Sequence, residues 1–391
     1  MLARFATSLL ALAALSDAAA WSGKLQRRAS EVPTLSPTSC VKGKAFDRIA
    51  IIWLENTDYD KAIGDPNLAW LAAKGITLDN YHAVTHPSQP NYLAAIGGDY
   101  FGMNHDDLTT FDANVSSIVD LLEDKGISWG EYQEDMRTPT QLLAPICMSG
   151  NTIQQVWQAM SYGNVLDTPE RLGVTKNLTL FQQDLENETL PQWMFITPNM
   201  TSDGHDTSVT VAGAWTRTFL EPLLENPKFM NNTLVLVTFD ENETYTIQNR
   251  VLAILLGDAV PESLIGTTDS TFYDHYSEIS TVQANWELDT LGRFDIGANV
   301  FSLVAEQTGD TLRKWSGPQT LDQRYFNYSY AGVFNHRSGA VRSYVKPNVE
   351  AEYAGRKVHQ SVVDTWKDSD LPSYYKTDLE IPDGLNPPEG Y

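Results

Sequence analysis

Four polar side chains stand at the ends of the two most apolar segments of the chain. Residues 49–54 end at Glu55 and Asn56, and residues 233–239 end at Asp240 and Glu241. Runs this apolar are typical of strands buried on both faces of a parallel sheet, and parallel strands bring their carboxyl ends to one edge. A hard divalent cation needs oxygen ligands gathered in this way. We therefore predict that these four residues bind one divalent metal ion, whose identity the sequence does not reveal.

A serine lies in a segment stiffened by two prolines, Thr85-His86-Pro87-Ser88-Gln89-Pro90-Asn91, just before an expected helix. The free N–H groups at a helix N-terminus favour a bound phosphate. A serine hydroxyl becomes a nucleophile only when a base or a metal activates it, and a metal bound to the Ser88 oxygen would do so. We predict that Ser88 is both the nucleophile and a metal ligand. The alternative is that Ser88 and Pro90 form only a capped turn.

Three histidines, His86, His205 and His275, lie in or beside polar clusters. Imidazolium can hold phosphate oxygens and imidazole can protonate a leaving alkoxide, so we predict catalytic and substrate-binding roles for all three. Asn91 and Asp206 complete the predicted substrate-binding residues. A single histidine is more often structural, and that is our interpretation of the remaining four: His82, His105, His336 and His359.

The N-terminus is typical of a secretory signal, because residues 1–20 contain Arg4, an apolar stretch from Phe5 to Leu15 and the small residues Ala18-Ala19-Ala20. No later stretch is long and apolar enough to span a bilayer, and the C-terminus lacks a hydrophobic tail, so we expect no membrane anchor. The net charge of −23, from 27 basic and 50 acidic residues, argues against nucleic acid as a partner. We expect a secreted protein of the extracellular space or cell wall.

A secreted chain with seven Asn-x-Ser/Thr sequons is expected to be a glycoprotein. Glycans are expected less at Asn199 and Asn242, which lie close to the predicted site. The five sequons expected to carry glycan are Asn114, Asn177, Asn187, Asn231 and Asn327. The two cysteines, Cys40 and Cys147, are expected to form a disulfide in an oxidising compartment, and two buried free thiols are the alternative.

The chain alternates between helical and strand patterns from about residue 46. Residues 21–45 are expected to be a flexible leader, 46–308 the catalytic domain, 135–190 an irregular lid-like insertion, and 309–391 a C-terminal extension that either wraps the core or is partly disordered. Helices are expected at 66–74, 90–96, 118–125, 207–224, 279–288 and 296–304. Strands are expected at 76–84, 127–132, 193–197, 233–239 and 250–256. The predicted fold class is α/β, with a mostly parallel central sheet between helices.

Five segments, in this order, resemble the secreted fungal acid phosphatases of the phosphoesterase family, which belongs to the alkaline-phosphatase-like superfamily and also contains bacterial phospholipases C and a bacterial acid phosphatase. They are Trp53-Leu54-Glu55-Asn56, His86-Pro87-Ser88-Gln89-Pro90-Asn91-Tyr92, Asp203-Gly204-His205-Asp206, Phe239-Asp240-Glu241 and Asp274-His275-Tyr276-Ser277. The resemblance runs from about Phe46 to Leu303. It implies that one metal ion lies beside Ser88, that Ser88 forms a phosphoserine, and that the three histidines contact phosphate. Bacterial relatives tend to have Asp-Asp where this chain has Asp240-Glu241.

These observations favour a secreted acid phosphatase that hydrolyses small phosphate monoesters by a metal-activated serine. The alternative enzyme is a phosphodiesterase of the phospholipase C type, which would need a wider, more apolar mouth. We favour the monoesterase because no apolar membrane-docking stretch is evident. An inert secreted binding glycoprotein is a third alternative. Nucleotide-driven phosphoryl transfer, dinucleotide redox chemistry, zincin proteolysis and α/β-hydrolase chemistry are disfavoured, because their sequence motifs are absent. The sequence does not indicate the oligomeric state.

Overall fold

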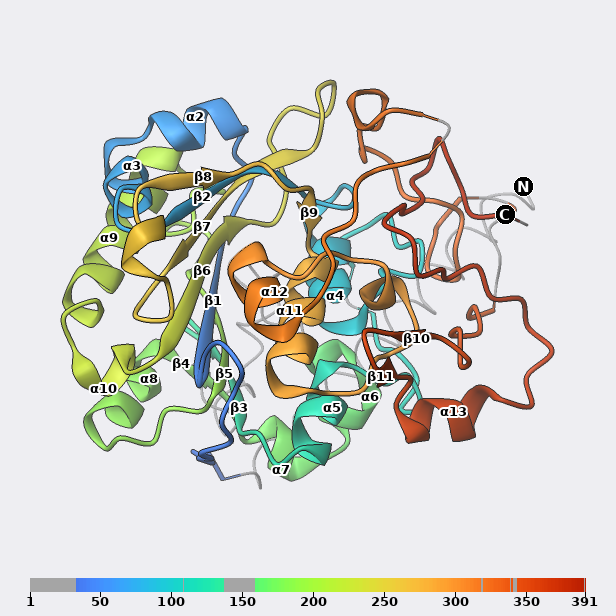
Figure 1. The fold of residues 1–391 in the computed structure, drawn as a ribbon, viewed down its shortest axis with the longest axis horizontal. Coiled ribbons are helices and arrows are strands. Elements are labelled where there is room, and N and C mark those ends of the chain that lie inside the picture. Colours follow the sequence, from blue (N-terminus) through green and yellow to red (C-terminus); the bar gives the residue numbers. More distant parts are fainter. Residues whose placement is uncertain are drawn as a thin grey trace, which may run out of the picture.

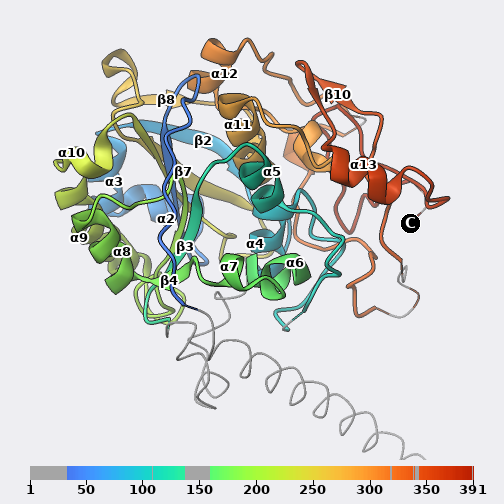
Figure 2. The ribbon, with the colours of Figure 1, turned by 90° about the horizontal axis from the view of Figure 1, so that it is seen from below.

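A computed structural model describes residues 33–391, apart from 108, 137–158, 318, 338, 340–342 and 390. The expected signal segment, Cys147 and part of the expected insertion lie outside these residues. A central sheet separates two groups of helices, and the C-terminal part of the chain lies beyond one of these groups (Figure 1; Figure 2). The large apolar core forms between the sheet and the helices.

The central sheet is mostly parallel, as predicted. Its strand order is β4 (Thr175–Asn177), β3 (Trp129–Gln133), β5 (Trp193–Thr197), β1 (Arg48–Leu54), β6 (Thr233–Phe239), β7 (Arg250–Leu256), β2 (Ile76–His82) and β8 (Thr267–Asp269), and β9 (Tyr273–Asp274) also pairs with β2. Only β7 runs antiparallel to its neighbours, β6 and β2. The carboxyl ends of β5, β1, β6, β2 and β9 therefore lie at the same edge of the sheet.

The two central strands, β1 and β6, are aligned residue by residue. Their register runs from the pair Arg48 and Thr233 to the pair Leu54 and Phe239. Nearly every side chain of both strands is buried, and each large aliphatic side chain buried in this way contributes roughly 1.5–3 kcal/mol to folding. Because the strands end at the same level, the residues that follow them leave the sheet side by side.

The helices form a layer on each face of the sheet. One layer contains α2 (Tyr59–Gly64), α3 (Pro66–Ala72), α8 (Leu178–Glu186), α9 (Val209–Leu223) and α10 (Pro227–Met230), and the other contains α4 (Ser88–Gly97), α5 (Ile118–Asp124), α11 (Tyr276–Trp286) and α12 (Ser302–Thr308) (Figure 1). The helix expected at 296–304 is wrong, since a 3₁₀ turn at Phe294–Ile296 precedes α12. In the described part of the chain, no helix has the length and apolar character needed to cross a bilayer.

Two segments expected to be loosely attached are part of the fold. Leu35 N donates to Gly173 O at 2.9 Å, and Ser39 Oγ donates to Gln192 Oε1 at 2.6 Å. The flexible-leader expectation is therefore wrong for these residues, because their polar groups are paired with the core. Between residues 159 and 190, the chain forms the short helices α6 (Gly163–Leu166) and α7 (Pro169–Leu172) and adds β4 and α8 to the main fold. The expected irregular insertion is wrong for this part.

The described residues of the C-terminal extension wrap the core. They contain little regular structure beyond the hairpin of β10 (Glu352–Tyr353) and β11 (Arg356–Lys357) and the helix α13 (Gln360–Trp366). Its aromatic side chains join a second apolar cluster with Tyr276 of α11. Asp99 lies inside this cluster and accepts hydrogen bonds from the hydroxyls of Tyr330 and Tyr375, at 2.7 and 2.5 Å. These bonds connect the extension to the loop after α4.

Glu131 of β3 provides a test of how burial affects stability. Its side chain is fully buried, its Oε1 accepts a hydrogen bond from Ala159 N at 3.0 Å, and burial raises its pKa from 4.5 to about 7. A carboxyl group with a raised pKa in the folded state binds its proton more tightly there. Its contribution to stability is therefore complete below about pH 4.5 and is lost as the pH rises through about 7.

We predict that Glu131→Gln reduces the pH dependence of the unfolding free energy between about pH 4.5 and 7.5 by roughly 3 kcal/mol. Denaturant unfolding at both pH values measures this difference. Glu225→Gln, which removes an exposed carboxyl group, is the control. An unchanged pH dependence in Glu131→Gln would contradict this assignment.

Candidate active site

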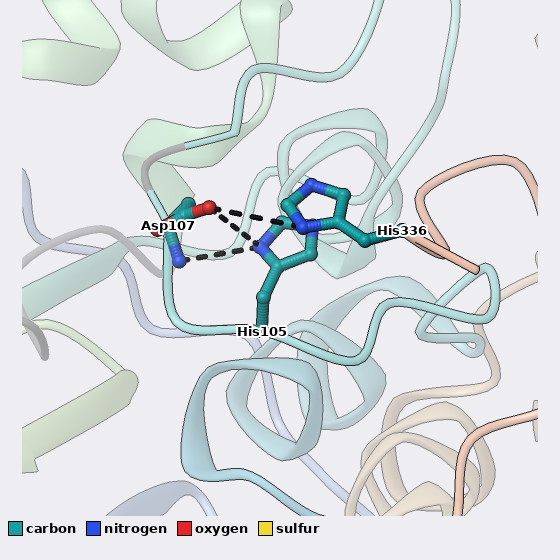
Figure 3. Close-up of side chains that lie close together, drawn as sticks. All are labelled: His105, Asp107 and His336. Carbon is teal, nitrogen blue, oxygen red and sulfur yellow. Dashed lines mark hydrogen bonds and ion pairs between the residues drawn. The ribbon is translucent and has the colours of Figure 1, made fainter. Parts of the chain in front are cut away.

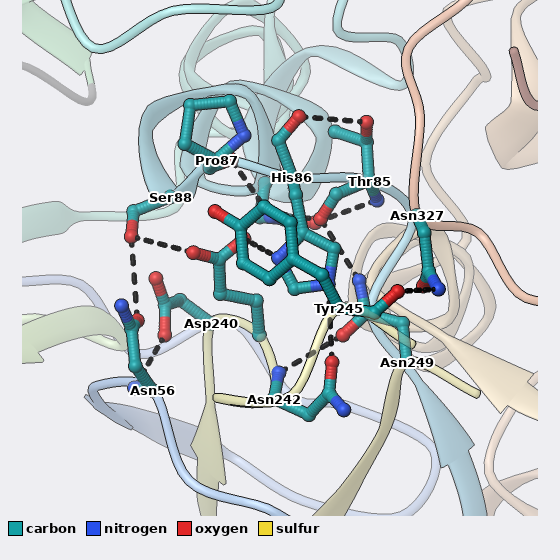
Figure 4. Close-up of polar contacts among 12 residues, drawn as sticks. Asn56, Thr85, His86, Pro87, Ser88, Asp240, Asn242, Tyr245, Asn249 and Asn327 are labelled. Carbon is teal, nitrogen blue, oxygen red and sulfur yellow. Dashed lines mark hydrogen bonds and ion pairs between the residues drawn. The ribbon is translucent and has the colours of Figure 1, made fainter. Parts of the chain in front are cut away.

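The predicted metal and nucleophile residues converge at the edge of the sheet where β1, β2 and β6 end (Figure 4). Ser88 Oγ lies 3.2 Å from Glu241 Oε1, 3.4 Å from Asn56 Oδ1 and 3.5 Å from Glu55 Oε2. Asp240 closes the group, because its Oδ1 accepts a hydrogen bond from Asn56 N at 3.2 Å. Four residues from two separate segments thus surround the hydroxyl group of Ser88.

The turn after β1 explains why two consecutive residues reach the same point. Asn56 has a φ of 35°, in the left-handed region that asparagine tolerates better than most residues. The chain therefore bends sharply after Glu55, and both side chains lie within 3.5 Å of Ser88 Oγ. The Tyr92 hydroxyl donates to Glu55 Oε1 at 2.6 Å and holds that carboxyl group in place.

Three carboxyl groups of this cluster are almost completely buried. Glu55, Asp240 and Glu241 are each at most 1% exposed. Burial raises the pKa of Asp240 and of Glu241 well above the ordinary range, and their mutual repulsion adds to the effect on Asp240. Among the described residues, no lysine or arginine forms an ion pair with either group. Buried carboxylates without a counter-charge are strongly unfavourable, so the cluster requires protons or a cation.

The donor atoms of the cluster fit a hard divalent cation. Glu55, Asn56, Asp240, Glu241 and Ser88 all offer oxygen, which is the ligand atom that Mg²⁺, Ca²⁺ and Mn²⁺ prefer. The terminal amide of Asn56 lies against the carboxylate of Asp240. In one orientation the amide nitrogen donates to Asp240 Oδ1 at 3.1 Å, and in the other the amide oxygen joins the oxygen cluster. The second orientation places two oxygens against each other, which a cation would stabilise.

His86 contacts the carboxylate cluster from the loop after β2. Its Nδ1 lies 2.6 Å from Glu241 Oε2, and its Nε2 lies 3.1 Å from Asn242 Oδ1. Its ring stacks on that of Tyr245, with centroids 3.8 Å apart. Burial lowers the pKa of His86 to about 4. His86 is therefore held firmly between two partners on the loop after β6.

His205 lies on the loop before α9 and is partly open to solvent. Its main-chain N donates to Asp203 Oδ1 at 2.9 Å, and its Nδ1 lies 3.0 Å from Asp206 Oδ1. The His205 side chain is 31% exposed, whereas those of His86 and His275 are at most 1% exposed. Of the three predicted histidines, His205 is the one that solvent reaches most readily.

Sequence reasoning missed Asp106, on the loop after α4. Its Oδ1 accepts a hydrogen bond from Gln89 N, the residue after Ser88, at 2.9 Å. Burial raises the pKa of Asp106, while the nearby His205 acts in the opposite direction, and Asp106 in turn raises the pKa of Glu241. Asp106 follows neither a strand nor a recognisable motif, so the sequence offered no signal for it.

His275 lies inside the protein, and the substrate contact expected for it stays a prediction. This side chain is completely buried at the start of α11, where Nε2 donates to Asp240 O at 2.7 Å and Nδ1 lies 3.2 Å from the Tyr81 hydroxyl. Both ring nitrogens therefore have partners inside the protein. Asn91 is also fully buried, where Oδ1 accepts from Val84 N and Nδ2 donates to Thr85 O. Its polar atoms hold the loop before Ser88, and the substrate contact expected for it stays a prediction.

Asn327 differs from the other expected glycan sites in its surroundings, and its glycosylation also stays a prediction. Its side chain is buried, and Nδ2 donates to the main-chain oxygens of Tyr245 and Ile247. A glycan would replace one of these hydrogens and would need open space. The side chains of Asn114, Asn187 and Asn231 are exposed and that of Asn177 is half-buried, so glycosylation at these four sequons stays a prediction.

Cys40 is exposed, and its predicted pairing with Cys147 stays a prediction because Cys147 lies outside the described residues.

Comparison with known proteins agrees with the resemblance seen in the sequence. A model of the phosphoesterase family matches residues 65–289. A probable acid phosphatase of Kluyveromyces lactis is 47% identical over 88% of this chain and 81% of its own length. A phosphate-repressible acid phosphatase of Penicillium chrysogenum is 51% identical over 72% of this chain and 69% of its own length.

Among solved structures, a protein in the alkaline phosphatase superfamily from Vibrio parahaemolyticus matches with a TM-score of 0.42 and 10% identity, over 66% of this chain and 73% of that one. The family match covers more than half of the chain and includes Ser88, Asp240 and Glu241. On this match and on the identity to the fungal relatives, the chain belongs to the phosphoesterase family.

Proposed function

We propose that this protein is a secreted acid phosphatase that hydrolyses phosphate monoesters through a phosphoserine at Ser88. The observation that carries the proposal is the group of three buried carboxyl groups around one serine hydroxyl at the start of a helix. The names of the fungal relatives support phosphate esters as the substrate class. The secretion signal expected at residues 1–20 supports an extracellular location.

Glu55, Asn56, Asp240 and Glu241 would hold one divalent cation beside Ser88 Oγ. When bound, the ion would supply the positive charge that activates the serine hydroxyl and offsets the buried carboxylates. Glu241 stands where bacterial relatives tend to have aspartate. Its Oε1 lies 3.2 Å from Ser88 Oγ, closer than the oxygens of Asn56 and Glu55 at 3.4 and 3.5 Å. We expect the amide of Asn56 to donate to Asp240 without the cation and to present its oxygen when the cation is bound.

Ser88 is the first residue of α4, so a phosphoryl group attached to Oγ would lie at the positive end of that helix. In the first step, Ser88 Oγ loses its proton to solvent and bonds to phosphorus as the bond to the ester oxygen breaks. We propose that His205 gives its proton to the leaving oxygen, because this histidine is open to solvent on the loop whose Asp203 O accepts from Glu55 N at 3.1 Å. In the second step, water attacks phosphorus and gives a proton back to His205 as the bond from phosphorus to Ser88 Oγ breaks; phosphate leaves, and the serine oxygen takes up a proton from solvent.

His86 and His275 act as positioning residues in this proposal. His86 holds Glu241 from one side, and His275 holds the main chain at Asp240 from the other. Asp106 engages Gln89 N, one of the N–H groups at the start of α4. These three contacts place the carboxylates and the helix before a substrate arrives.

An exposed aromatic side chain beside the site supports a substrate with an apolar leaving group, because the ring of Tyr245 stacks on that of His86. Tyr245, Ile247 and Tyr328 are between 45% and 49% exposed, and Asn327 connects the two loops that carry them. A phosphodiesterase of the phospholipase C type could use the same surface. Turnover of p-nitrophenyl phosphate compared with bis(p-nitrophenyl) phosphate separates the two, and preferred cleavage of the diester would overturn the monoesterase proposal. An inert binding glycoprotein would cleave neither ester.

Replacing the proposed nucleophile tests the mechanism. We predict that Ser88→Ala lowers kcat for p-nitrophenyl phosphate by about 10³-fold or more, because a covalent step depends on that single oxygen. Acid quenching during turnover should trap phosphate on the wild-type protein and not on the variant. Ser270→Ala, at an exposed serine, is the control. Retention of most activity in Ser88→Ala would show that the nucleophile is elsewhere.

Removing one carboxylate tests the cation. We predict that Asp240→Asn loses one equivalent of bound divalent metal and at least about 100-fold in kcat, the size expected when one group that stabilises a transition state is removed. Elemental analysis of the purified protein measures the first effect and a phosphatase assay the second. Asp258→Asn removes an exposed carboxylate and serves as the control. Unchanged metal content in Asp240→Asn would refute the ligand assignment.

Replacing Tyr245 tests whether its ring contacts the leaving group of the substrate. We predict that Tyr245→Leu lowers kcat/KM for p-nitrophenyl phosphate relative to glycerol 2-phosphate by roughly 2- to 10-fold, because an aromatic contact contributes about 0.5–1.5 kcal/mol. Tyr245→Phe keeps the ring and should keep the ratio. Equal losses on both substrates in Tyr245→Leu would mean that the ring supports His86 and does not select the leaving group.

A further inference from the structure

A second group of metal-binding side chains lies outside the proposed active site. His105 and Asp107 belong to the loop after α4, and His336 belongs to the C-terminal extension (Figure 3). Asp107 Oδ2 lies 3.9 Å from His105 Nδ1 and 4.0 Å from His336 Nδ1. All three ligand atoms lie within 4.8 Å of one another. The sequence had suggested only structural roles for both histidines.

The protonation of His105 suits a metal ligand. Its Nε2 lies 3.0 Å from Phe334 O, which can only accept, so Nε2 carries the proton. Asp107 N donates to His105 Nδ1 at 3.2 Å, so Nδ1 carries the lone pair, and a bound ion would take the place of this hydrogen bond. A histidine that donates one ring N–H to a main-chain carbonyl and presents the other nitrogen is the usual arrangement of a metal-binding imidazole.

The main chain brings the two segments together independently of the side chains. His336 N donates to Asn104 Oδ1 at 2.9 Å, and Phe334 N donates to Phe101 O at 3.3 Å. The two imidazole rings stack with their centroids 3.7 Å apart. The histidines are therefore held next to each other without any ion.

We propose that His105, Asp107 and His336 form a second divalent-metal site of a kind different from the oxygen cluster at Ser88. Two imidazole nitrogens and one carboxylate oxygen suit Zn²⁺ and similar transition metals, whereas the all-oxygen cluster suits Mg²⁺, Ca²⁺ or Mn²⁺. Ligand atoms of tetrahedral Zn²⁺ lie about 3.3 Å apart, so each of the two contacts with Asp107 must shorten by about 0.6 Å. The side chains of Asp107 and His336 are 75% and 60% exposed, so both have room for this movement.

An ion at this second site would connect three parts of the protein. Asp106 lies between the ligands His105 and Asp107 and accepts from Gln89 N, next to Ser88. The third ligand, His336, belongs to the C-terminal extension. A bound Zn²⁺ would therefore fix the segment that carries Asp106 and fasten the extension to the loop after α4. The site is structural, and it positions one side of the active site.

Calorimetric titration of the full-length protein with Zn²⁺, in saturating Mg²⁺ to occupy the oxygen cluster, tests the proposal. The wild type should bind one more equivalent of Zn²⁺ than His336→Ala. Asp107→Asn should bind that ion at least about 10-fold more weakly, since a neutral amide is a poorer ligand than a carboxylate. Zn²⁺ should also raise the Tm of the wild type more than that of His336→Ala, because a ligand stabilises the state that binds it.

His359→Ala is the matched control, since His359 contacts Ser361 and Asp124 and is not one of the three ligands. It should bind Zn²⁺ as the wild type does. Equal Zn²⁺ stoichiometry in the wild type and His336→Ala would overturn the proposal, as would a wild type that binds no Zn²⁺ under these conditions. If His336→Ala fails to fold, the same comparison with Asp107→Asn decides the question, because its side chain is exposed.

Discussion

The rest of the structure depends on holding three buried carboxyl groups against one serine hydroxyl. Glu55, Asp240 and Glu241 repel one another in a site from which water is largely excluded, and burial raises the pKa of Asp240 and Glu241. A fold keeps such a group only when the backbone around it is rigid. The paired strands β1 and β6 provide that rigidity. Because their residues are aligned one by one, Glu55 and Asn56 leave the sheet beside Asp240 and Glu241.

The antiparallel strand of the central sheet, β7, also contributes to the site. It runs opposite to its neighbours, so the residue that precedes it lies at the same edge as the carboxyl ends of β2 and β6. That residue, Asn249, accepts from Asn242 N at 2.9 Å and donates to Thr85 O at 2.9 Å. The buried amide of Asn249 thus joins two loops: the one after β6, which carries Asp240 and Glu241, and the one after β2, which leads to Ser88. The C-terminal extension adds Ser329, whose Oγ lies 2.7 Å from Thr85 Oγ1.

The proposed metal-binding residues could be predicted from the sequence because they follow the ends of apolar strands. Apolar runs that stop at Glu55 and Asp240 are visible in the sequence because burial on both faces requires apolar residues at every position. The sheet, most of its strands and the convergence of these residues on Ser88 were predicted on this basis. Strand β4 was missed, because three residues within a polar segment carry too little pattern to mark a strand.

The remaining roles depend on contacts between distant segments. His275 appeared equivalent to His86 in the sequence, yet it lies under the end of β6 with both ring nitrogens engaged. Asn327 matched a sequon, yet its amide lies inside the protein and holds the Tyr245 loop. Asp106 carried no signal at all. A side chain's local sequence does not reveal whether it faces the site, solvent or the core, because that depends on how loops pack after the sheet has formed.

The central claim is that distant strand ends together hold a cation beside Ser88. Anomalous diffraction from crystals soaked in Mn²⁺ tests it most directly, since the peak locates the ion without reference to activity. We expect a peak about 2.0–2.6 Å from oxygens of Glu55, Asp240 and Ser88, the range for a hard cation bound to oxygen. Full occupancy at other positions with no peak in this cluster would contradict the account.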